Sequence, residues 1–190
     1  MLSPRSADRP RRRAACASPA APERRAARLG ASRLPVVASF SVVGDFVTAV
    51  GGEKVAVVTL VGADADAHTF EPTPADVAAV GRAAVVFENG AGFEAGWLDR
   101  TSAASGGRGP RVAVTDGLPL LTGACGHDHP PGPGGEPEPD PHAWHEVTNA
   151  IHMVGKVRDG LAAADPANAE HYRANAAAYE ARLRALDAWI

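Results

Sequence analysis

Two histidines stand where they could bind a metal ion. His68 follows an apolar run at 54–61, and His142 follows Pro141 at the end of a long polar segment. Neutral imidazoles are good ligands for a borderline-soft divalent cation such as Zn²⁺, but a tetrahedral site needs about four ligands. The pair therefore predicts part of a metal site, although a lone loop histidine is equally compatible with a solvated surface residue. Metal binding by neutral imidazoles should weaken as the pH falls through about 6.5.

Other histidines offer further donors. His127 and His129, with Cys125, place soft donors at alternate positions in a loop rich in Gly and Pro, 116–139, which is either a metal-capturing loop or a solvated one. His145 is either a surface residue or an extra ligand. The two remaining histidines, His152 and His171, fall on predicted helix surfaces, where we do not expect ligands.

The surrounding pattern alternates short apolar runs with helical stretches. We expect strands at 34–40, 54–61, 83–88 and 111–115, and helices at 42–50, 74–82, 93–104, 148–165 and 166–190. This alternation predicts an α/β fold with a parallel four-stranded sheet covered by helices on both faces. Both candidate ligands then lie at the carboxyl edge of the sheet, where open α/β sheets bind their ligands.

Three residues are candidate N-caps: Ser41, Thr73, which precedes a proline suited to the first helical position, and Thr148. The last helix carries apolar residues on one face and is expected to be still helical at Ile190, so that a further part of the protein is missing. These apolar residues are Tyr172, Tyr179, Leu183, Leu186 and Ile190.

Charge is distributed unevenly along the chain. Residues 1–33 carry nine arginines against two acidic residues, a net charge of +7, whereas residues 34–190 carry ten basic and twenty acidic residues, a net charge of −10. An acidic body argues against nucleic acid as a partner. The leader 1–33 has no periodic pattern and is expected to be disordered, without a clear signal peptide. Its Cys16 and the distant Cys125 indicate no disulfide framework, and no run has the length of a transmembrane helix.

Several motifs, in order, resemble one known family: the metal-binding solute receptors of zinc and manganese ABC transporters, or zinc-uptake component A proteins. They are Ala38-Ser39-Phe40-Ser41 with Gly44-Asp45, Asp66-Ala67-His68-Thr69-Phe70-Glu71-Pro72-Thr73-Pro74, Phe87-Glu88-Asn89-Gly90-Ala91-Gly92-Phe93-Glu94 with Trp97-Leu98, Asp140-Pro141-His142-Ala143-Trp144, and Asp165-Pro166-Ala167-Asn168 followed by Tyr172, Asn175, Tyr179, Leu183 and Leu186-Asp187. The match covers about residues 34–190.

The resemblance implies two α/β lobes joined by one long helix, with a single metal ion between the lobes. Residues 34–165 would be the N-terminal lobe and 166–190 the start of the connector, and the second lobe, with its two ligands, is missing from this chain. His68 and His142 take the places of the first two ligands. The family implies Zn²⁺, or alternatively Mn²⁺, as cargo, a membrane permease of an ABC importer as partner, a monomer in the periplasm or cell envelope, and no enzymatic activity. Where relatives commonly carry Leu-Asp-Pro after the tryptophan, this chain has His145-Glu146-Val147.

Three alternative functions stay open on the sequence. A truncated fragment could buffer metal without transport. A zinc hydrolase would have to use His142, His145 and Glu146, whose order differs from H-E-x-x-H. A dinucleotide-binding domain would use the glycine turn 90–96, whose glycines miss the G-x-G-x-x-G spacing by one residue.

Overall fold

The computed structural model describes residues 33–94, 96–122 and 139–190. The predicted leader, apart from Arg33, lies outside the described residues, as do Cys125, His127 and His129.

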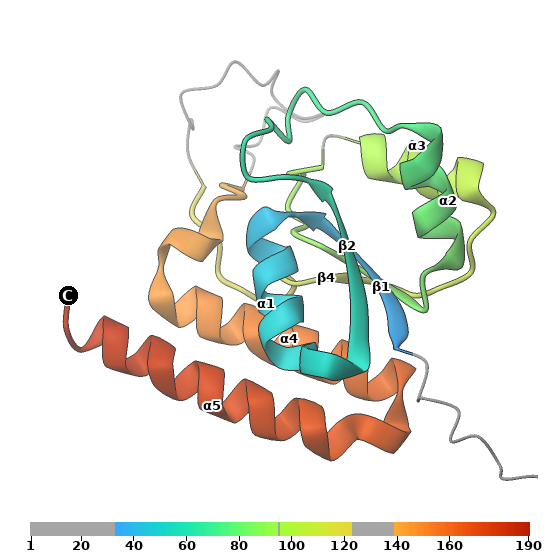
Figure 1. Cartoon of the computed structure of the whole chain (residues 1–190). Coiled ribbons are helices and arrows are strands. Elements are labelled where there is room, and N and C mark those ends of the chain that lie inside the picture. Colours follow the sequence, from blue (N-terminus) through green and yellow to red (C-terminus); the bar gives the residue numbers. More distant parts are fainter. Residues whose placement is uncertain (1–32, 95, 123–138) are drawn as a thin grey trace, which may run out of the picture. The chain divides into compact units, whose positions relative to one another are not determined.

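Four parallel strands form the sheet in the order β2-β1-β3-β4, which confirms the predicted architecture (Figure 1). The strands are β1 (Leu34–Phe40), β2 (Val55–Val61), β3 (Val85–Glu88) and β4 (Arg111–Ala113). Strand β1 is central, and its Val37 pairs with Val58 of β2 and Val86 of β3. Since every strand runs the same way, the segments that follow them all leave from one edge of the sheet.

Helices cover both faces of this sheet (Figure 1). Helices α1 (Ser41–Gly51) and α4 (Val147–Ala164) lie on one face, and α2 (Pro74–Arg82) and α3 (Trp97–Ser105) lie on the other. Helix α5 (Ala169–Asp187) turns back along α4 and packs against α4 and α1. Short 3₁₀ turns occur at Gly52–Lys54, Ala143–His145 and Pro166–Asn168. None of the described helices combines the length and the apolar composition needed to cross a membrane.

The core lies between the sheet and these helices. Its largest fully buried side chains include Trp97, Tyr172, Phe87, Leu98, Met153 and Leu161. Helix α4 approaches the sheet closely at Gly160, where a Cβ atom would lie 2.6 Å from the Phe87 ring. Helix α4, which follows the His142 segment, is therefore packed closely against the sheet.

One of the three predicted caps is confirmed. The Thr73 hydroxyl accepts a hydrogen bond from the Asp76 N–H (3.4 Å), and the Asp76 carboxylate accepts one from the Thr73 N–H (2.8 Å). Ser41 does not cap α1: it is the first helical residue, and the extended Phe40 occupies the N-cap position. Thr148 lies inside α4, and its hydroxyl donates to the Glu146 carboxylate instead.

Four predicted boundaries are also wrong. The helix expected from Phe93 begins at Trp97, because Gly96 has a φ angle of +73°, which a right-handed α-helix does not accept. Strand β4 ends at Ala113 rather than at residue 115. The last helix begins after the 3₁₀ turn rather than at residue 166, and it ends at residue 187 rather than continuing to 190.

The apolar face of α5 contacts the core over only part of its length. Tyr172 is fully buried, and Tyr179 and Leu183 pack against the core from partly exposed positions. Leu186 is 45% exposed and Ile190 is 84% exposed. The predicted stripe is therefore real at the start of α5 and solvent-exposed towards its end.

Candidate metal centre

The fold brings His68 and His142 together. Their ring centroids lie 5.9 Å apart, although 74 positions separate the two residues in the sequence. His68 comes from the segment after β2, and His142 from the segment that leads into α4. Both side chains are partly exposed, with 27% exposure for His142. The topology thus gives the expected pairing, while the role of these residues as metal ligands stays a prediction.

An aspartate two residues before each histidine holds its backbone. Asp66 Oδ1 accepts a hydrogen bond from the His68 N–H, and Asp140 Oδ1 accepts one from the His142 N–H, each at 2.9 Å. Such Asx turns close the chain locally and reduce the freedom of the residue that follows. The repeated pattern Asp-x-His is visible in the sequence and is the local signal from which these two turns could have been predicted.

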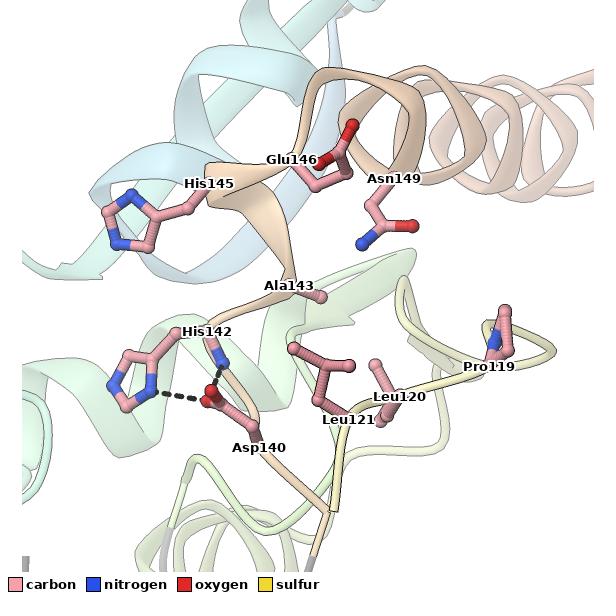
Figure 2. Close-up of a pocket in the computed structure, with 9 residues that line it drawn as sticks. All are labelled: Pro119, Leu120, Leu121, Asp140, His142, Ala143, His145, Glu146 and Asn149. Carbon is pink, nitrogen blue, oxygen red and sulfur yellow. Dashed lines mark hydrogen bonds and ion pairs between the residues drawn. The ribbon is translucent and has the colours of Figure 1, made fainter. Parts of the chain in front are cut away.

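Asp140 also orients the imidazole of His142. Its Oδ1 lies 2.8 Å from His142 Nδ1, so that Nδ1 carries the proton and Nε2 is the candidate metal-binding atom (Figure 2). The hydrogen bonds from the backbone and then the ring of His142 hold the pKa of Asp140 below its usual range. A histidine that binds a metal through one ring nitrogen commonly donates the N–H of the other ring nitrogen to a carboxylate.

Aromatic side chains line the base of the pair. Phe93, which is 4% exposed, packs edge-on against both His68 (5.3 Å between centroids) and His142 (6.1 Å). Trp144 packs against His142 (5.3 Å) and Phe93 (5.2 Å), and Phe40 lies beneath them, 4.6 Å from Phe93. An apolar base of this kind excludes water from one side of the imidazoles and limits their rotation.

His145 lines the same cavity as His142. Its ring is exposed and packs against Trp144, 5.4 Å between centroids. Within the ranges that the structure describes, no three His, Cys, Asp or Glu side chains are grouped so that they could hold one metal ion. His145 as an extra ligand beside His68 and His142 therefore stays a prediction.

A cavity of about 320 Å³ opens beside His142 (Figure 2). In Figure 2 the His145 ring projects to the same side as that of His142, whereas Glu146 points away. The lining residues are Pro119, Leu120, Leu121, Asp140, His142, Ala143, His145, Glu146 and Asn149.

The glycine turn after β3 is not arranged to bind a phosphate. The backbone N–H groups of Asn89 and Gly90 already donate to the carboxylate of Glu94, at 2.7 and 3.1 Å. Burial raises the pKa of Glu94, which is 5% exposed, and these two hydrogen bonds oppose that rise. Because an acidic side chain occupies the donors that would cradle a phosphate, the structure argues against the dinucleotide-binding alternative.

Fold, histidine pair and apolar base together are those of a metal-binding α/β protein. Residues 36–190 match the model of the family described as zinc-uptake complex component A, periplasmic, and the chain belongs to this family. Its members are substrate-binding components of metal ABC transporters.

The curated relatives carry different metals in their names. The chain is 38% identical over 159 residues to the manganese-binding lipoprotein MntA of Halalkalibacterium halodurans, covering 83% of this chain and 48% of the relative. It is 32% identical over 160 residues to the iron ABC transporter substrate-binding lipoprotein MtsA of Streptococcus pyogenes, covering 82% and 49%. The chain thus spans about half the length of the curated relatives it matches.

Solved structures agree with the fold. A manganese-bound periplasmic metal-binding protein from candidatus Liberibacter asiaticus superposes with a TM-score of 0.68 at 31% identity, covering 78% of this chain and 52% of that one. The Zn(II)-bound AdcA of Streptococcus pneumoniae superposes with a TM-score of 0.68 at 30% identity, covering 82% and 31%.

Proposed function

We propose that this chain supplies half of the metal site of a substrate-binding protein that captures a divalent transition metal for an ABC importer. The observation that carries the proposal is the convergence of His68 and His142, 5.9 Å between ring centroids, with Asp140 orienting one of the rings. In this proposal residues 34–165 are the N-terminal lobe and 166–190 begin the connector helix. The remaining ligands come from a second lobe.

Reversible capture suits this arrangement better than catalysis. Two neutral imidazoles on separate loops give a metal ion two bonds, and the metal keeps open positions that other ligands can fill. A hydrolytic centre would need a third ligand and a general base beside the pair. In this proposal the protein carries its metal ion as cargo and catalyses no reaction.

Zinc is the proposed cargo, with manganese as the alternative. Imidazole suits Zn²⁺, and a given site of nitrogen and oxygen ligands binds Zn²⁺ more tightly than Mn²⁺. The relatives named above carry manganese, iron or zinc in their names, so the family supports a transition metal without choosing one. A competition titration of Mn²⁺ against Zn²⁺ on this chain measures the preference directly, and we expect Zn²⁺ to win.

The proposed setting is the cell envelope. The relatives named above are described as lipoproteins or as a periplasmic metal-binding protein. In this proposal the protein acts as a monomer that delivers its metal ion to a membrane permease. The acidic body of residues 34–190, with its net charge of −10, suits a cation as cargo.

A zinc titration with three variants tests the metal site. We expect His68→Ala and His142→Ala each to weaken Zn²⁺ binding at least tenfold, because each leaves a single imidazole. His152→Ala is the matched control: His152 lies on α4, hydrogen-bonds the backbone carbonyl group of Asp116 and belongs to neither ligand loop. If both ligand variants bind Zn²⁺ as tightly as the control does, the proposed function is wrong.

A further inference from the structure

Two buried side chains hydrogen-bond the residues just before the two histidines. The indole N–H of Trp97 donates to the carbonyl oxygen of Ala67 at 3.0 Å, and the amide N–H of Asn89 donates to that of Pro141 at 2.9 Å. Trp97 is 2% exposed and Asn89 is fully buried. Each bond therefore fixes the peptide group that leads directly into a candidate ligand.

Both donors belong to one short piece of the chain. Asn89 follows β3, and Trp97 is the first residue of α3. Between them, Phe93 packs against the rings of both histidines. We call the described residues 89–94 and 96–97 the β3–α3 connection. It contacts both ligand loops, whereas the two loops come from segments more than 70 positions apart.

The β3–α3 connection is itself held firmly. The Glu94 carboxylate accepts two of its backbone N–H groups, and the Thr115 hydroxyl donates to the carbonyl oxygen of Asn89 at 2.6 Å. Gly90 has a φ angle of +85°, and a Cβ atom there would lie 2.9 Å from the side chains of Ala113 and Thr115. Because the β3–α3 connection is held in place by these contacts, the carbonyl groups that it hydrogen-bonds are held in place as well.

From this geometry we propose that Asn89 and Trp97 are positioning residues that set the separation of His68 and His142. Because each donor fixes the carbonyl group one residue before a ligand, a lost bond lets that loop drift while the histidine itself is unchanged. Metal ligands have to be held to within roughly 0.5 Å, so a small drift costs affinity. The inference rests on the proposed function, since it assumes that the two histidines bind one metal ion together.

The amide of Asn89 serves here as a donor. Its Nδ2 donates to the carbonyl oxygens of Pro141 and Gly90, while its Oδ1 is buried without a hydrogen-bond partner in the described structure. Because no group donates to Oδ1, Asn89→Ala removes only the two hydrogen bonds from Nδ2 and leaves no donor without its partner. Trp97→Phe removes the indole N–H and keeps an aromatic ring against Phe70, 4.9 Å away.

The test follows Zn²⁺ binding to the chain through the ¹⁵N resonances of the histidine rings. In the unaltered chain we expect the signals of His68 and His142 to shift together, with one affinity. In Asn89→Ala and Trp97→Phe we expect Zn²⁺ to bind about tenfold more weakly, which is the lower end of the losses seen when a hydrogen-bond partner of a metal ligand is changed. We also expect the ¹⁵N signals of the two rings to shift at different Zn²⁺ concentrations. If Asn89→Ala does not fold, Trp97→Phe carries the test alone.

Asn175→Ala is the matched control for a loss of stability. Its Nδ2 donates to the carbonyl oxygen of Val50 at 3.0 Å, a comparable bond between side chain and backbone that joins α5 to α1. We expect this variant to lose stability in urea and to keep parallel shifts with affinity within twofold. Parallel shifts and unaltered affinity in both positioning variants would overturn the inference and leave the proposed function standing. If neither ring shifts in the unaltered chain, the proposed function fails, and the inference fails with it.

Discussion

At the scale of single residues, the site is a pair of similar turns. Each histidine follows an aspartate by two positions, and each aspartate accepts the backbone N–H of its histidine. At His142 the same oxygen also holds the ring, through Nδ1 at 2.8 Å. The ring of a metal ligand has to present one particular nitrogen to the metal, so the carboxylate of Asp140 should matter for binding as well as for folding.

Asp140→Asn tests this role. The amide oxygen can still accept one hydrogen bond, but without its charge it holds the imidazole less strongly, so we expect Zn²⁺ affinity to fall by about tenfold. A zinc titration measures the loss. Asp116→Asn is the control, because the Asp116 carboxylate pairs with Lys156 of α4. Equal affinities for the two variants would contradict the orienting role.

Residue type and position were enough to predict the two histidines but not their support. The local pattern alone makes a histidine a candidate metal ligand when it follows a strand of a parallel sheet, because such sheets bind ligands at the carboxyl ends of their strands. Asn89 reaches across 52 positions to Pro141, and Trp97 reaches across 30 to Ala67. Such bonds depend on the tertiary fold, and an Asn after a strand or a Trp on a helix gives no local sign of its partner.

At the scale of elements, the apolar runs predicted all four strands. The inner strands β1 and β3 are mostly buried, and a strand covered on both faces has to be almost continuously apolar. The edge strands β2 and β4 are apolar too, although part of each is exposed. The cap of α2 was also predictable, since Thr73, Pro74 and Asp76 all act within one turn. The caps expected at Ser41 and Thr148 were wrong. A capping hydroxyl requires an extended backbone at its own residue. Phe40, one residue before Ser41, and Glu146, two residues before Thr148, have that conformation instead.

The contact between α5 and α1 should weaken at alkaline pH. The Tyr179 hydroxyl donates to the Asp45 carboxylate at 2.9 Å, and burial, followed by this hydrogen bond, raises the pKa of Tyr179 from 10 to about 12. The pKa is thus higher in the folded chain than in the unfolded one. The stabilisation from Tyr179 is therefore complete below pH 10 and is lost as the pH rises through about 12.

Urea unfolding of the chain and of Tyr179→Phe at several pH values measures this dependence. We expect the unaltered chain to be more stable than Tyr179→Phe at pH 9 by about 1 kcal/mol, the net worth of a typical hydrogen bond, and this advantage to disappear towards pH 12. Comparing the two chains at each pH removes the contribution of the other groups that titrate in alkali. A constant difference across that range would mean that the hydroxyl does not stabilise the contact between the helices.

At the scale of the whole molecule, metal binding and folding are coupled. His68 and His142 meet only when β2, the β3–α3 connection and the segment before α4 are all in place, so the unfolded chain has no preformed pair. A metal ion that binds the folded pair must therefore stabilise the entire fold. Metal binding at the site should therefore be measurable as a change in the free energy of unfolding.

Zinc should raise the free energy of unfolding of the chain, and a chelator should reverse the effect. At a free Zn²⁺ concentration of roughly 100 times Kd, linkage gives about 2.7 kcal/mol if only the folded state binds. The seven histidines and two cysteines of the unfolded chain also bind zinc, so the measured gain should be smaller. His152→Ala removes one of these unfolded-state ligands and leaves the pair intact, so it should keep the gain, whereas His68→Ala and His142→Ala should lose it. An equal gain in all three variants would place the stabilising metal away from the histidine pair.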